Sequence, residues 1–171
     1  KRIVHLFRPV QEVVGQYGKV ALSCHENADC PVGYDKEISK RSVAIIVHYN
    51  RNLELSGLCT GTLLNNTKED GRALFLTAAH CMGPGEDPFD WVFEFHHRSA
   101  YCDDGGTVIM GNDAFQTTSG ATILESIPES DMLLLELNIP AWQLKEMGVC
   151  YSGWNVNDVS TGTDDYYGLH H

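Results

Sequence analysis

LFLTAAHC, at residues 74–81, is the stretch of this sequence that decides the fold. Its three leading residues are apolar and β-favouring, which predicts a buried strand. The small residues that follow let the backbone turn tightly, so that His80 is presented at the strand end with Cys81 directly after it. The stretch therefore predicts both a β-structure and an exposed histidine beside a cysteine.

His80 is suited to proton transfer, because an imidazole titrates near neutral pH. It can take a proton from a hydroxyl nucleophile and return it to a leaving amine if a carboxylate holds its other ring nitrogen. The best candidate for that carboxylate is Asp131 in SDMLLLEL, residues 130–137, at the mouth of a leucine-rich strand that would hold it half-buried. We therefore expect His80 and Asp131 to lie within about 3.2 Å of each other.

Five motifs occur in an order and spacing that resemble the trypsin-like serine endopeptidases, and among them the bacterial lysyl endopeptidases. They are CHENADCPVG (24–33), CTGTLLNNT (59–67), FLTAAHC (75–81), DMLLLEL (131–137) and SGWN (152–155). The resemblance covers about residues 20–171. It implies an all-β fold, a trypsin-like antiparallel β-barrel that is the first barrel of a double-barrel protein, followed by the start of the second.

The resemblance also implies roles for residues. His80 becomes the general base and Asp131 its orienting partner, in a secreted enzyme that cleaves protein or peptide substrates after a basic residue, lysine by the nearest likeness. The family places its nucleophilic serine in a glycine-rich turn, and this sequence has no such turn. Ser152 and Ser160 are better explained as structural residues. We expect the nucleophile beyond His171, in a C-terminal half of the same protein, and expect these 171 residues alone to be inactive.

Six cysteines are present, and five of them fall on cysteine positions of the family. The resemblance implies a disulfide between Cys30 and Cys102 and another between Cys59 and Cys81, which favours an oxidising, extracellular compartment. Closing these loops stabilises the fold by about 4 and about 3 kcal/mol in the loop-closure model. For Cys24 we expect a partner beyond His171. Pairing with Cys150 is the second option, and Cys150 has no clear counterpart in the family.

The chain divides into four predicted parts. Residues 1–19 have no counterpart in the family and form a pro-segment remnant or N-terminal arm, in which valines 10, 13 and 14 could make a short edge strand. Residues 20–137 form the first barrel with His80 and Asp131. Residues 138–148 form a short helical connector capped by Asn138. Residues 149–171 begin the second, truncated barrel.

Several local patterns give further expectations. Residues 42–49 and 91–97 are predicted strands, and residues 117–127 form another with Gly120 as a possible bulge. Residues 24–33 are predicted to be a loop. His48 is interpreted as a strand-end residue. The pair His96 and His97 cannot chelate one ion if both lie on a strand, because successive side chains point to opposite faces.

Composition excludes several function classes. With 12 basic and 23 acidic residues, the net charge of −11 opposes binding to a phosphate backbone, so we expect no nucleic-acid partner. No apolar run approaches membrane-spanning length, so no membrane partner is expected either. The scattered cysteines lack the spacing of a zinc site, and we expect no metal and no cofactor.

One alternative stays open at the level of sequence. A lone barrel that kept the scaffold and lost the chemistry would be a non-catalytic binding or interaction module. The presence of both His80 and Asp131 counts against such decay.

Overall fold

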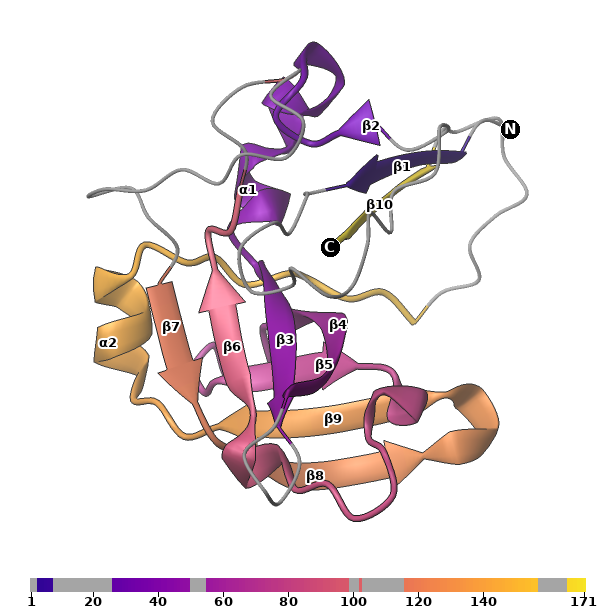
Figure 1. The fold of residues 1–171 in the computed structure, drawn as a ribbon. Helices are drawn as coiled ribbons and strands as arrows, with labels where there is room; N and C mark the ends of the chain where they lie inside the picture. The colour runs from indigo at the N-terminus through magenta and orange to yellow at the C-terminus, as the bar shows by residue number, and fades with distance from the viewer. Residues whose placement is uncertain (1–2, 8–25, 50–54, 99–101, 103–115, 157–165) are drawn as a thin grey trace.

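The computed structural model describes residues 3–7, 26–49, 55–98, 102, 116–156 and 166–171. Within these residues the chain is mostly β-structure (Figure 1). The strands are β1 (Ile3–Phe7), β2 (Glu26–Asn27), β3 (Val43–Tyr49), β4 (Leu55–Leu64), β5 (Leu74–Thr77), β6 (Val92–Phe95), β7 (Gln116–Ser119), β8 (Ala121–Ile127), β9 (Met132–Leu137) and β10 (Tyr166–His170). The helices are α1 (Glu37–Lys40) and α2 (Ala141–Glu146), with 3-10 turns η1 (Pro31–Lys36), η2 (Ala79–Cys81), η3 (Pro88–Asp90) and η4 (Pro128–Ser130).

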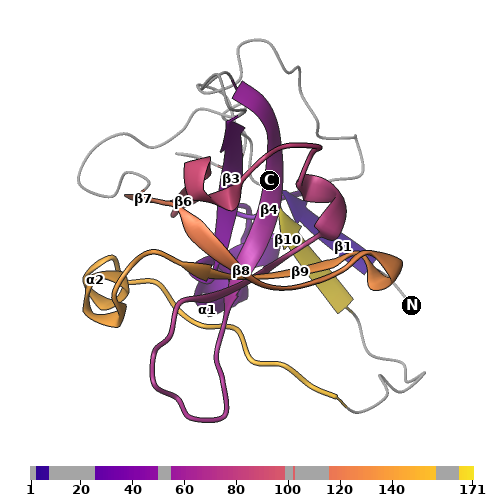
Figure 2. The same ribbon diagram turned by 90° about the horizontal axis from the view of Figure 1, so that it is seen from below.

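Seven strands form one antiparallel sheet in the order β7-β6-β3-β4-β5-β9-β8. The sheet curls into a half-barrel, which the two orthogonal views make visible (Figures 1 and 2). The all-β prediction is therefore confirmed. Among the described residues, no helix has the length and apolar character needed to cross a membrane.

The hollow of the half-barrel is filled by large apolar side chains. β3 is buried along almost its whole length, from Val43 to His48, as its continuous β-branched run predicts. Phe75 packs edge-to-face against Phe93 and Phe95, with ring centroids 5.1 and 6.3 Å apart. Each fully buried phenylalanine contributes about 1.5–3 kcal/mol of hydrophobic stabilisation. This aromatic cluster fixes β5, the strand that leads to His80.

The prediction that a strand extends to His97 is wrong, because β6 ends at Phe95. His96 adopts a positive φ of 58°, which turns the chain out of the sheet. Glu94 is only 6% exposed, and its Oε2 lies 3.1 Å from Nδ1 of His97. The alternation of side chains along a strand therefore does not apply to His96 and His97.

Residues 117–127 do not form one strand with a bulge at Gly120. β7 pairs with β6, whereas β8 pairs with β9, and Gly120 is the corner between the two strands. Its φ of +80° is a left-handed conformation that glycine adopts without steric cost. The register irregularity lies further along, between Ile123 and Glu125.

The predicted helix is present, but its predicted cap is wrong. α2 begins after Pro140, which is the N-cap and makes no side-chain capping bond. Asn138 lies before the helix, where its backbone N–H donates to the carbonyl of Gly120 over 2.9 Å. The extended backbone at Pro140 delays the helix start. α2 buries Leu144 in the hydrophobic core.

A second, three-stranded parallel sheet has the order β10-β1-β2. Its central strand, β1, belongs to the segment predicted as an N-terminal arm, and the predicted edge strand at valines 10, 13 and 14 lies outside the described residues. The predicted loop at residues 24–33 is also structured in part, because it contains β2 and the start of η1. Residue 24 itself is not among the described residues.

Candidate functional site

His80 is positioned by β5 and the turn η2 that follows it. The backbone leaves β5 at Thr77, whose hydroxyl donates to the carbonyl of Thr60 on β4 over 2.9 Å. Ala78 is still extended, and the chain then tightens into η2. The His80 side chain keeps 73% of its surface exposed. The structure thus presents the histidine at the end of a strand, as the motif predicts, and Phe75 and Thr77 of that strand are buried.

Asp131 reaches the same place from the start of the neighbouring strand, β9. It follows the turn η4 and precedes β9, with a left-handed φ of 53° that aspartate tolerates better than most residues. β5 and β9 are antiparallel neighbours, and Thr77 pairs with Leu133 at the end of the ladder. The end of β5 and the start of β9 therefore meet at the same edge of the half-barrel.

The side chains of His80 and Asp131 are in direct contact. Asp131 Oδ2 lies 2.6 Å from His80 Nδ1, and Asp131 Oδ1 accepts a 2.9 Å hydrogen bond from the backbone N–H of His80. A third bond runs from the N–H of Ala79 to the Asp131 carbonyl, over 3.1 Å. The 2.6 Å between the carboxylate oxygen and the ring nitrogen is within the distance of about 3.2 Å that the sequence led us to expect.

The contact determines which nitrogen of the neutral His80 imidazole carries the proton. The His80 backbone N–H, followed by the His80 ring, lowers the pKa of Asp131, so the carboxylate is ionised at neutral pH. An ionised carboxylate only accepts hydrogen bonds, so Nδ1 carries the proton that lies between them. The lone pair of the neutral imidazole is then on Nε2. Chemically, the pair can act as an oriented general base.

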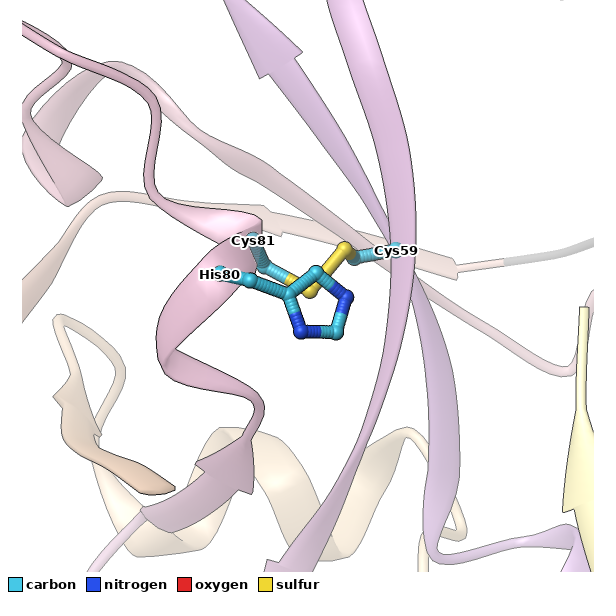
Figure 3. A group of neighbouring side chains, drawn as sticks. All are labelled: Cys59, His80 and Cys81. Carbon is cyan, nitrogen blue, oxygen red and sulfur yellow. A yellow bond between two sulfur atoms is a disulfide. The ribbon is translucent and has the colours of Figure 1, made fainter. Parts of the chain in front are cut away.

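A disulfide lies directly beside the imidazole. Cys59 on β4 and Cys81 in η2 are bonded, with their Cα atoms 6.1 Å apart, and Figure 3 shows the His80 ring next to the two sulfurs. One potential ligand atom each from Cys59, His80 and Cys81 lie within 4.8 Å of one another. Metal ligation by cysteine requires a thiolate, so the disulfide form is not a metal site. In this form the bridge anchors η2 to β4.

A second disulfide joins Cys30 and Cys102, 72 residues apart in sequence. Both bonded pairs are those implied by the resemblance. The side-chain amide of Asn27 also donates to the carbonyl of Cys102 over 3.3 Å. A disulfide and a hydrogen bond therefore both connect Cys102 to the segment that contains Asn27 and Cys30. Cys150 carries a free thiol, and Cys24 lies outside the described residues.

The hydroxyl of Ser152 belongs to a small polar cluster. It lies 2.7 Å from the hydroxyl of Ser42 and 3.0 Å from that of Thr62. Its backbone also bridges to Leu64 at the end of β4. These contacts explain Ser152 as a structural residue, and Ser160 lies outside the described residues.

Sequence reasoning missed the backbone contribution to the site and the burial of His48. The N–H groups of Ala79 and His80 hold Asp131 in place, and no sequence pattern reveals such contacts. His48 lies in β3 beside a register shift and is only 2% exposed, stacked on Trp91 with ring centroids 4.2 Å apart. Its Nδ1 lies 3.2 Å from Glu86 Oε2, and burial lowers its pKa.

The chain is similar to known proteins. The family model described as lysyl endopeptidase, C-terminal domain, matches residues 19–171. A lysyl endopeptidase of Pseudomonas aeruginosa is 32% identical over 108 residues, which cover 63% of this chain and 22% of that protein. The chain therefore spans about 22% of the length of this curated relative. From the match over residues 19–171, the chain belongs to the lysyl endopeptidase C-terminal domain family.

Proposed function

We propose that this protein is a secreted serine endopeptidase that cleaves peptide bonds after lysine, with His80 as general base and Asp131 as its orienting partner. The observation that carries the proposal is the pair of hydrogen bonds that Asp131 accepts from the ring and the backbone N–H of His80. Membership of an endopeptidase family supports the reaction class. The name of the Pseudomonas aeruginosa relative supports the preference for lysine.

In this mechanism, Nε2 of His80 takes the proton of a serine hydroxyl as the oxygen attacks the scissile carbonyl. The same nitrogen then gives the proton to the departing amine. Asp131 keeps the proton on Nδ1 before the attack and stabilises the imidazolium that forms during it. The roles require an exposed Nε2, which the 73% exposure of the His80 side chain supports.

We assign the nucleophile, the oxyanion hole and the lysine pocket to parts of the full-length protein outside these 171 residues. The engagement of Ser152 in a structural hydroxyl cluster supports that assignment. We also propose that residues 20–137 form the first barrel, residues 138–148 the connector and residues 149–171 the beginning of the second barrel. In this division, residues 1–19 are a pro-segment or an N-terminal arm.

The test uses the full-length protein and peptide substrates that differ only in the residue before the scissile bond, lysine, arginine or glutamate. Asp131→Asn should lower kcat by about 10⁴-fold, because an amide that donates to Nδ1 stabilises the wrong imidazole tautomer. Glu129→Gln is the matched control, since Glu129 is an exposed acid two residues away, and it should leave kcat unchanged. A kcat for Asp131→Asn within about tenfold of the unsubstituted enzyme contradicts the assigned roles.

A second experiment locates the nucleophile. A fluorophosphonate probe, which reacts with activated serines, should label the full-length protein but not the 171-residue chain. Labelling of the shorter chain at any serine contradicts our placement of the nucleophile. If the full-length protein is neither labelled nor active on any peptide, the non-catalytic binding module becomes the better account. Recovery of the active protein from the culture medium tests secretion.

A further inference from the structure

The Cys59–Cys81 disulfide and the imidazole of His80 form one compact cluster. Two sulfurs and one imidazole nitrogen lie within 4.8 Å of one another (Figure 3). We propose that reduction of this disulfide creates a binding site for a thiophilic divalent cation, Zn²⁺ or Cd²⁺, with Cys59, Cys81 and His80 as ligands. The site would be absent from the oxidised protein and would withdraw His80 from proton transfer.

The chemistry balances with a dithiol as the reductant. The dithiol gives up two electrons and two protons and closes into its own disulfide, while the bond between the Cys59 and Cys81 sulfurs breaks and both become thiols. Binding of the cation then displaces one proton from each thiol. Two thiolates neutralise the charge of the cation, and the neutral imidazole supplies a third ligand. Water fills the fourth position.

The fold keeps the ligands together after the S–S bond is broken. Cys59 lies on β4 and Cys81 follows β5, and these two strands are hydrogen-bonded neighbours through the pairs from Thr62↔Leu76 to Leu64↔Leu74. The Cα separation of 6.1 Å is therefore held by the sheet as well as by the bridge. Zinc binds sulfur at about 2.3 Å and nitrogen at about 2.0–2.1 Å, so ligand atoms of a tetrahedral site lie about 3.3–3.8 Å apart. Side-chain rotation can supply the adjustment.

Asp131 completes the arrangement from outside the ligand set. It accepts the proton of Nδ1 at 2.6 Å and so leaves the lone pair on Nε2, which is the ring nitrogen we expect to bind the cation. Metal-bound histidines in proteins typically donate their other N–H to a carboxylate, and loss of that partner lowers metal affinity by about 10- to 100-fold. His80 is exposed, so the cation reaches the site from solvent. Among the described residues, the group of three potential ligands contains Cys59 and Cys81 but not Cys30 or Cys102, so the Cys30–Cys102 disulfide serves as an internal comparison.

The test titrates Cd²⁺ into the 171-residue chain after reduction with a dithiol and removal of the dithiol by desalting. Thiolate-to-Cd²⁺ charge-transfer absorption reports sulfur ligation, and the ¹⁵N shift of His80 Nε2 reports nitrogen ligation. We expect one tight site in the reduced chain and none in the oxidised chain. His80→Ala should weaken Cd²⁺ binding by about tenfold or more, and Asp131→Asn by about 10- to 100-fold. Glu129→Gln should bind as the unsubstituted chain does.

A Cys59→Ser/Cys81→Ser variant removes the proposed sulfur ligands and keeps the thiols of Cys30 and Cys102. It should lose the tight site although those thiols remain. The proposal is wrong if His80→Ala, or this double variant, binds Cd²⁺ as tightly as the reduced unsubstituted chain. Unfolding of the chain on reduction also contradicts the proposal, because unfolded thiols bind the cation without regard to residue 80. These readouts do not depend on peptidase activity, so the outcome is independent of the proposed function.

Discussion

The contact between Gly61 and Phe75 gives a quantitative test of how the strand bearing His80 is packed. Gly61 on β4 faces the ring of Phe75 on β5. A Cβ atom added at Gly61 would lie 2.2 Å from Cε1 of Phe75 and 2.7 Å from the carbonyl oxygen of Leu76. Phe75 is fully buried and cannot withdraw its ring into solvent. Gly61→Ala should therefore overpack the core, at a cost of about 1–3 kcal/mol.

Phe75→Leu relieves part of this clash while having a cost of its own. It removes two edge-to-face contacts, with Phe93 and Phe95, which are worth about 0.5–1.5 kcal/mol each. In the double variant the contact with the ring is gone, whereas the contact with the Leu76 carbonyl remains. The double variant should therefore cost less than the sum of the single variants. We expect a coupling free energy of about 1–2 kcal/mol, inside the range typical of residues in contact.

Urea unfolding followed by circular dichroism measures the free energy of unfolding of the unsubstituted protein, the two single variants and the double variant. Gly57→Ala is the matched control on the same strand, because no atom lies within 4 Å of a Cβ built there. It should change the free energy of unfolding by less than about 0.5 kcal/mol. Additivity of the Gly61 and Phe75 substitutions within about 0.5 kcal/mol would refute the packing argument.

Two further predictions concern pH and backbone strain. Burial lowers the pKa of His48, so the unfolded chain binds protons more readily than the native state, and stability falls as pH drops through about 6.5 until native His48 is charged. His48→Gln can still donate a hydrogen bond to Glu86, and its free energy of unfolding in urea should fall less between about pH 7.5 and pH 5.5 than that of the unsubstituted protein. An equal fall in the two proteins contradicts the attribution of this pH dependence to His48. Gly120→Ala should cost more than Gly85→Ala: both have a positive φ, but only at Gly120 does an added Cβ meet an atom, Asn138 Nδ2 at 2.7 Å. Equal melting temperatures for these two variants would count against this explanation.

The sequence predicts which residues around the site form strands, but it does not predict which of these strands lie next to each other in the sheet. The apolar runs at residues 74–77 and 132–137 are strands, because continuous leucine and phenylalanine have few alternatives beside a tight turn. Nothing in their periodicity states that β5 and β9 are adjacent. The expectation that His80 and Asp131 meet came from their chemistry, because a histidine that acts as a base needs a carboxylate to orient it. The pairing of strands 55 or more residues apart is a property of the whole sheet, and local patterns do not encode it.

The incorrect predictions share a physical cause, which is the conformation of single residues. His96 adopts a positive φ angle that is uncommon for a residue with a Cβ atom, and the chain leaves the sheet there. Gly120 separates β7 from β8, although the residues on both sides form strands. Asn138 has the side chain of a helix cap, but the backbone is still extended at Pro140, two residues later, so the helix starts after Pro140. Tertiary contacts select these conformations.

The geometry at Asp131 also determines which substitution can separate its chemical role from its structural role. One carboxylate oxygen faces Nδ1 of His80, and the other accepts the backbone N–H of the same residue, so Asp131 holds both the ring and the turn η2. Asp131→Ala removes both contacts, and a loss of activity in that variant does not distinguish a displaced histidine from a histidine with the wrong tautomer. Asp131→Asn keeps an acceptor for the backbone N–H and reverses only the polarity of the bond to the ring. A large rate loss in the asparagine variant with unchanged stability therefore isolates the proton on Nδ1 as the contribution of Asp131.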